Sequence, residues 1–193
     1  MDRLPTWLPV WNELAIHDSL WSLWLSRRLP LGPNLPILSA GLDGLANSWH
    51  RSTRTKSGGL FIPTEQYRAL IAEGRESIAK QMAEHSEKDR VLRKIDTANE
   101  MGGFAKLLAF FSDLGLAISD NEKDALRARH SPAHGGRNDN DDVRVLLTQA
   151  RVYETLYHRV LLKALGYDGH YIDYGVESWP RRHIDQPSGG DVK

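Results

Sequence analysis

Residues 143–165 show the strongest periodic pattern in this chain of 193 residues, and they constrain its fold more than any other segment. Apolar side chains recur at every third or fourth position, a spacing that places them on one face of an α-helix. Gly166 follows, and glycine commonly ends a helix in the left-handed conformation. The apolar positions are Val143, Leu146, Leu147, Ala150, Tyr153, Leu156, Tyr157, Val160, Leu161, Ala164 and Leu165. A helix of this kind must pack against further elements to bury that face.

The other apolar segments repeat the helical spacing, and none alternates as a strand would. The capping-box pattern Ser119-x-x-Glu122 marks the start of one of these helices. Helices are predicted over residues 10–29, 36–50, 63–82, 86–100, 104–111 and 119–129, with a basic, flexible loop over 51–60. The sequence therefore predicts an all-α, compact bundle of five to seven helices.

The composition excludes several classes of protein. Lysine plus arginine equals aspartate plus glutamate at 25 each, so the chain lacks the overall positive charge of a duplex-DNA binder. There is no cysteine, which excludes disulfides and thiolate metal sites. The sequence contains neither a transmembrane-length apolar run nor a signal peptide, so we expect a cytoplasmic protein without a membrane partner.

A polar segment between the last two predicted helices combines residue types that suit phosphodiester chemistry. Arg129 and His134 lie five positions apart, and His130 follows the arginine. Pro132 disfavours helical backbone at the residue before it, while Ser131 is a good N-cap for a new turn. We therefore expect the junction to bring Arg129 and His134 together at an exposed helix end.

Metal-free RNA cleavage proceeds by attack of the 2′-hydroxyl on the adjacent phosphorus. It needs a base, an acid for the leaving 5′-oxygen and a cation for the charged intermediate. Histidine transfers protons near neutral pH, and arginine binds phosphate oxygens through two parallel hydrogen bonds. The alternative for Arg129 and His134 is a structural pair that caps helix carbonyls. His130 and His134 have metal-pair spacing, but Ser131 and Pro132 depart from the zinc motif, so no metal site is predicted.

The segment from Arg129 to His134 resembles the Arg-x4-His motif of HEPN domains, an all-helical family that includes many metal-independent ribonucleases. His130 stands where the family often has asparagine. Residues 37–45 and 161–171 resemble the ApeA-like branch of that family, so that the similarity spans roughly residues 36–174. It implies a HEPN-like helical domain over 36–174, which leaves residues 1–35 as an N-terminal helical extension. The polar, Pro- and Gly-containing composition of residues 175–193 predicts a disordered tail.

The resemblance implies an endoribonuclease that acts as a toxin or antiviral-defence effector, needs no cofactor and binds RNA. A homodimer is expected because one protomer offers too few groups for both the acid and the base; an antitoxin or sensor protein is a further expected partner. An aspartate among apolar residues is costly to bury unless paired, so Asp43 is expected near Arg129 or another arginine. The candidate site residues are Arg129, His134 and His130 for catalysis, with Asp43, Ser131 and Arg127 in binding or supporting roles.

Two alternatives belong to other functional classes. The first is a catalytically silent HEPN module for dimerisation or nucleotide sensing, and the second is a helical interaction protein in which the motif is structural. The tryptophans at positions 7, 11, 21, 24 and 49 have helical spacing, which favours core or dimer contacts over base stacking. The basic residues 51–56 are expected to form a solvated loop, with RNA phosphates as the alternative contact.

Overall fold

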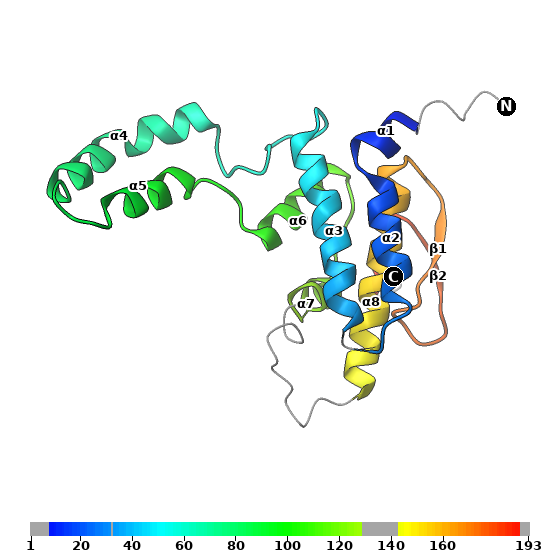
Figure 1. The fold of residues 1–193 in the computed structure, drawn as a ribbon. Coiled ribbons are helices and arrows are strands. Elements are labelled where there is room, and N and C mark those ends of the chain that lie inside the picture. The colour runs from blue at the N-terminus through cyan, green and yellow to red at the C-terminus, as the bar shows by residue number, and fades with distance from the viewer. Residues whose placement is uncertain (1–7, 32, 129–142, 190–193) are drawn as a thin grey trace.

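A computed structural model of the chain describes residues 8–31, 33–128 and 143–189. Eight helices and one antiparallel two-stranded sheet lie within these ranges (Figure 1). The helices are α1 (Leu8–Glu13), α2 (Ile16–Ser26), α3 (Asn34–Arg51), α4 (Thr64–Gln81), α5 (Lys88–Thr97), α6 (Gly103–Asp113), α7 (Asp120–Ala128) and α8 (Val143–Ala164). The strands are β1 (His170–Ile172) and β2 (Arg181–His183). The predicted all-α fold is confirmed.

Helix α8 lies at the centre of the core, as its apolar stripe predicts. It packs against α3 and α7, and α3 packs in turn against α2 and α6. The fully buried apolar side chains of this core include Leu42 and Leu45 of α3, Leu107 and Phe110 of α6, Leu126 of α7, and Leu156 and Val160 of α8. The first turns of α8 differ from the prediction, because Val143 and Leu147 are exposed.

The N-terminal helices belong to the same core. Val10 and Leu14 pack into it together with Ile16 and Leu23 of α2. The single helix predicted over 10–29 is divided because Ala15 adopts a left-handed backbone with φ of 50°, which interrupts the helical hydrogen bonds. This division gives eight helices in the described residues, where at most seven were predicted. The core includes side chains from both sides of residue 35, the predicted end of the N-terminal extension.

Helices α2, α3 and α8 meet closely around Tyr157. Its hydroxyl donates to the carbonyl of Ser19 at 2.8 Å and lies 2.6 Å from Oγ of the same serine. A Cβ at Gly41 would overlap this hydroxyl, so glycine is what allows α3 to approach. Burial raises the pKa of Tyr157 to about 12, which keeps the hydroxyl protonated as a donor.

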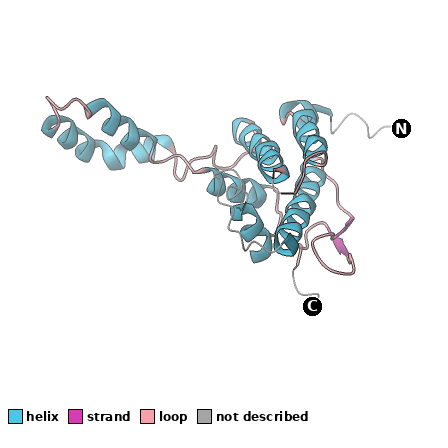
Figure 2. Cartoon of the chain, turned by 60° about the horizontal axis from the view of Figure 1, so that its bottom comes forward, coloured by secondary structure: helices cyan, strands magenta, loops and turns pink. Residues whose placement is uncertain are grey.

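Helices α4 and α5 form an arm that projects from the body (Figures 1 and 2). Neither helix has a buried residue. The predicted buried side of α5, comprising Val91, Leu92 and Ile95, is only half-buried because it faces α4 alone. The chain is therefore a helical body with a two-helix arm, where a compact bundle was expected.

The basic segment predicted as a flexible loop over 51–60 is organised by Asp113 at the end of α6. Its Oδ2 accepts hydrogen bonds from Trp49 Nε1 at 3.1 Å, from the Lys56 backbone N–H at 3.1 Å and from the Thr55 hydroxyl at 3.4 Å. These contacts fix the path of the chain between α3 and the arm.

The segment from 175 to 189 is part of the fold, whereas a polar, disordered tail was expected from residue 175. Strand β2 pairs with β1 in a register that places Tyr171 opposite Arg182. Ile184 and Ser188 are completely buried. The two short strands had no alternating pattern by which to be predicted. Among the described helices, none combines the length and apolar character needed to cross a bilayer.

Candidate functional site

The predicted catalytic residues Arg129, His130 and His134, together with Ser131, lie outside the residues that the structure describes. They belong to the connection between the end of α7 at Ala128 and the start of α8 at Val143. The structure therefore defines the two helices that lead into and out of the candidate site, and the contacts that hold those helices together.

The start of α7 is fixed by the predicted capping box, which is confirmed. The backbone N–H of Glu122 donates to Ser119 Oγ at 3.2 Å, and the backbone N–H of Ser119 donates to Glu122 Oε2 at 2.9 Å. Two amide donors at the helix end are thus satisfied reciprocally. The Ser119 hydroxyl also donates to the Ser188 carbonyl at 2.6 Å, which joins α7 to the C-terminal segment.

A buried ion pair ties α7 to α8. Arg159 Nη1 lies 2.5 Å from Glu122 Oε1, and both side chains are fully buried. Nε and Nη2 of Arg159 donate to the Ile184 carbonyl, at 3.2 and 3.1 Å, and Nη2 also donates to the Ala117 carbonyl at 3.1 Å. Burial raises the pKa of Glu122, and the charge of Arg159 opposes that rise. The charges are paired and hydrogen-bonded, as buried charges must be.

Arg127 occupies the last turn of α7, two residues before Arg129 in the sequence. It is exposed, pairs with Asp124 at 2.9 Å, and its guanidinium carbon lies 5.1 Å from the centre of the Phe104 ring. A phosphate must therefore compete with one aspartate, in a solvent-exposed setting, to bind this arginine.

Asp43 lies on α3 between the buried Leu42 and Leu45, and it is half-buried. Ser39 Oγ donates to its Oδ2 at 3.2 Å, within the same helix. The carboxylate is thus not in open solvent. Its predicted proximity to Arg129 stays a prediction, because Arg129 lies outside the described ranges.

Three side chains near β2, Asp168, His183 and Asp185, have the composition of a metal site. His183 Nε2 lies 3.3 Å from Asp168 Oδ1, and His183 Nδ1 lies 3.5 Å from Asp185 Oδ2. The two carboxylates therefore approach different nitrogens of the ring, and Lys163 Nζ lies 2.5 Å from Asp185 Oδ1. An ammonium in contact with one carboxylate and a ring between the two favour an ion-pair cluster over a single bound cation.

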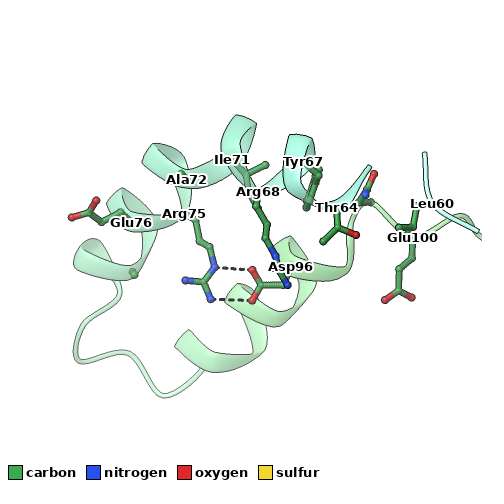
Figure 3. A pocket seen from close by; sticks show the side chains of 12 residues that line it. Leu60, Thr64, Tyr67, Arg68, Ile71, Ala72, Arg75, Glu76, Asp96 and Glu100 are labelled. Atoms are coloured by element: carbon green, nitrogen blue, oxygen red, sulfur yellow. Dashed lines mark hydrogen bonds and ion pairs between the residues drawn. The ribbon is translucent and has the colours of Figure 1, made fainter. Parts of the chain in front are cut away.

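A groove of about 750 Å³ lies between α4 and α5. Figure 3 shows Arg75 and Asp96 facing one another across it, joined by hydrogen bonds of 2.7 and 2.9 Å. The Arg75 guanidinium beside Asp96 holds the pKa of that carboxyl below its usual value. Arg75 and Asp96 thus neutralise one another within the arm. Among the described residues no histidine lines the groove, so it offers no imidazole for proton transfer near neutral pH.

The tryptophans divide between core and surface. Trp49 is buried and Trp11 packs against the core, as their spacing predicted. Trp21 and Trp24 are exposed on α2 and stack with ring centres 4.9 Å apart. Their exposure excludes a core role for this pair. The alternative role in a dimer contact stays a prediction.

No protein-family model, curated protein or solved structure matches the chain.

Proposed function

We propose that this chain is a metal-independent endoribonuclease of HEPN type, with Arg129 and His134 as its reacting side chains. The observation that supports it most is the position of the Arg-x4-His sequence between α7 and α8, two helices tied by the buried Glu122–Arg159 pair. Catalysis depends on side chains held within a fraction of an ångström of productive geometry, and the buried pair fixes the two helices that flank the motif in the sequence.

In the proposed reaction the ribose 2′-hydroxyl attacks the adjacent phosphorus, and the bond from phosphorus to the 5′-oxygen breaks. His134 removes or returns a proton, since imidazole titrates near neutral pH. Arg129 binds the phosphate oxygens and stabilises their developing charge. His130 supplies a second proton-transfer group. Asp43, Ser131 and Arg127 orient these groups or bind the RNA.

The proposed active unit is a homodimer in which two motifs face one another. One protomer offers His130 and His134 as its only motif imidazoles, whereas two protomers offer separate groups for the base and the acid. At the start of α8 the apolar side chains of Val143, Val145 and Leu147 are exposed, and a contact between two protomers at this end of the helix would bury them. Light scattering at micromolar concentration is expected to give twice the mass of the chain; a strictly monomeric protein would contradict this arrangement.

RNA is expected to be cleaved in the presence of EDTA, and DNA of the same base sequence is expected to be spared. The nucleophile is the 2′-hydroxyl, which DNA lacks, and no step uses a metal ion. The measurement is gel analysis of labelled RNA and DNA strands incubated with the purified chain, with the Arg129→Ala protein as control. Loss of all cleavage on chelation, or equal cutting of DNA, would overturn the mechanism and leave the silent HEPN module as the better account.

We propose that the enzyme acts in the cytoplasm as a toxin or antiviral-defence effector, with an antitoxin or sensor protein as its regulating partner. A ribonuclease of this kind must be held inactive until needed. The projecting arm of α4 and α5 is a large surface outside the body on which such a partner can bind.

A further inference from the structure

A second hollow lies on the first half of α8, in the helix that the motif leads into. It has a volume of about 560 Å³ and is enclosed by one side of α8 and the turn over residues 174–179. Arg151 lies eight residues after the start of α8, which is about 12 Å along the helix axis at 1.5 Å per residue. The lining residues are Thr148, Arg151, Tyr174, Gly175, Val176, Glu177, Ser178 and Trp179.

The turn that covers this hollow is held from beneath by Asp173. This carboxylate is fully buried and accepts hydrogen bonds from Arg182 Nε at 2.9 Å, from the Ser188 hydroxyl at 2.6 Å and from the Gly175 backbone N–H at 3.1 Å. The backbone N–H of Asp173 donates to the Pro180 carbonyl at 2.9 Å, which closes the turn. The turn is therefore fixed in shape before any ligand binds.

Gly175 sets the position of the turn on α8. A Cβ at this glycine would lie 2.8 Å from Val152 Cγ2 and 2.7 Å from Ser188 Oγ, so only glycine permits the approach. Val152 is next to Arg151 in the helix and one turn after Thr148. Close contact at Val152 thus brings the aromatic residues of the turn beside Arg151.

Two aromatic rings of the turn are displayed on the surface, where they make little contribution to the core. Tyr174 and Trp179 are 47% and 56% exposed, and their ring centres are 5.7 Å apart at an angle of 65°. Ser178 and Trp179 both have positive φ, of 75° and 47°. Such a conformation is costly for a bulky residue, and strained residues of this kind cluster at functional sites.

Arg151 supplies an available positive charge at the same hollow. It is exposed, and it forms no hydrogen bond or ion pair among the residues that the structure describes. Most other arginines of the body are engaged, for example Arg27 with Glu154 and Arg54 with Glu13. Glu177, also in the lining, is the one acidic group there and can accept a hydrogen bond from an amino group of a nucleobase.

We propose that this hollow binds one unstacked nucleotide of single-stranded RNA, with the base against Trp179 and Tyr174 and a neighbouring phosphate on Arg151. Aromatic side chains bind bases of every sequence through their flat faces, and arginine binds phosphate through paired N–H groups. This inference rests on the proposed ribonuclease function: it adds an RNA-binding subsite on α8, the helix that follows the Arg129/His134 segment in the sequence.

The test is the affinity for a short, fluorescein-labelled single-stranded RNA, measured by fluorescence anisotropy in the full chain carrying His134→Ala, which slows cleavage during the measurement. Trp179→Ala and Arg151→Gln are each expected to weaken binding about tenfold, in line with the loss of one base stack or one phosphate contact. Trp179→Phe and Arg151→Lys are expected to keep most of the affinity. Phe61→Ala and Arg93→Gln, which remove an exposed aromatic ring and an exposed arginine elsewhere, are the matched controls.

Cleavage by the same variants without His134→Ala separates this inference from the proposed function. If RNA is cut but Trp179→Ala and Arg151→Gln bind it as the parent does, the subsite is wrong and the ribonuclease stands. If RNA binds through Trp179 and Arg151 but is not cut, the subsite stands and the ribonuclease is wrong. Equal weakening by the controls, or no RNA binding at all, would overturn the subsite.

Discussion

Replacing Glu122 by alanine is expected to lower the free energy of unfolding by about 3–5 kcal/mol, the usual effect of removing one partner from a buried ion pair. Arg159 would remain fully buried with its charge uncompensated, and a guanidinium cannot lose its proton to relieve this. Urea unfolding followed by far-UV circular dichroism measures the change.

Arg159→Met is expected to be less harmful than Glu122→Ala, because the remaining carboxyl can be protonated. Burial raises the pKa of Glu122 above its unfolded value, and without Arg159 nothing of opposite charge opposes that rise. An acid whose pKa is raised on folding favours the folded state below the unfolded pKa and loses this contribution as pH rises through the folded pKa. The deficit of Arg159→Met should therefore shrink on acidification below neutral pH.

The double variant Glu122→Met with Arg159→Met is expected to recover most of the stability, since two apolar side chains leave no buried charge. The matched control is Asp96→Ala on the arm, which breaks an ion pair that solvent already screens and should leave unfolding close to that of the parent. Equal losses in Glu122→Ala and Asp96→Ala would show that the pair does not hold α7 on α8.

The helices that follow a clear apolar period could be predicted from the sequence. Leu42 and Leu45 on α3, and Leu156 and Val160 on α8, are fully buried at the positions the pattern gives. The start of α7 was also predictable, because the capping box is a local interaction between residues three apart.

Arg159 shows what periodicity cannot reveal. An arginine beside an apolar stripe indicates the solvent side of a helix, yet this side is covered by the C-terminal segment through Ile184. The polar composition of that segment predicted a disordered tail. The segment is instead held by the Ile184 backbone carbonyl, which binds Arg159, and by Arg182, which binds Asp173, and neither contact produces an apolar run in the sequence. Arg159 is therefore buried by contacts with residues distant in the chain, which the helical period cannot indicate.

The two halves of the candidate site differ in how far the sequence could define them. Arg129 and His134 are recognisable from their chemistry and spacing alone. The hollow at Arg151 is not, because Trp179 is 28 residues away in the chain and the turn that joins them depends on the buried Asp173. Neighbouring residues give no signal for such a site.

Arg129→Ala and His134→Ala are each expected to lower the rate of RNA cleavage by about 10²-fold or more, the usual size of acid–base and electrostatic contributions. His130→Asn should be milder, since it introduces the residue that HEPN domains often have at this position. Rates are measured on a labelled RNA at saturating enzyme, with circular dichroism to verify the fold. His85→Ala, at an exposed histidine between α4 and α5, is the control and should cleave as the parent does.

Full activity in the His134→Ala protein would exclude His134 from the proton transfers. A loss of equal size in His85→Ala would show that the effect is not specific to the motif.

The most direct test of the account is the chemistry of the cleaved ends. RNA is incubated with the parent chain in EDTA, and the products are examined by mass spectrometry. Attack by the 2′-hydroxyl predicts a 2′,3′-cyclic phosphate on one fragment and a free 5′-hydroxyl on the other, with these products formed far more slowly by the His134→Ala protein. A 5′-phosphate with a free 3′-hydroxyl, or no cleavage by the parent chain, would contradict the proposed ribonuclease.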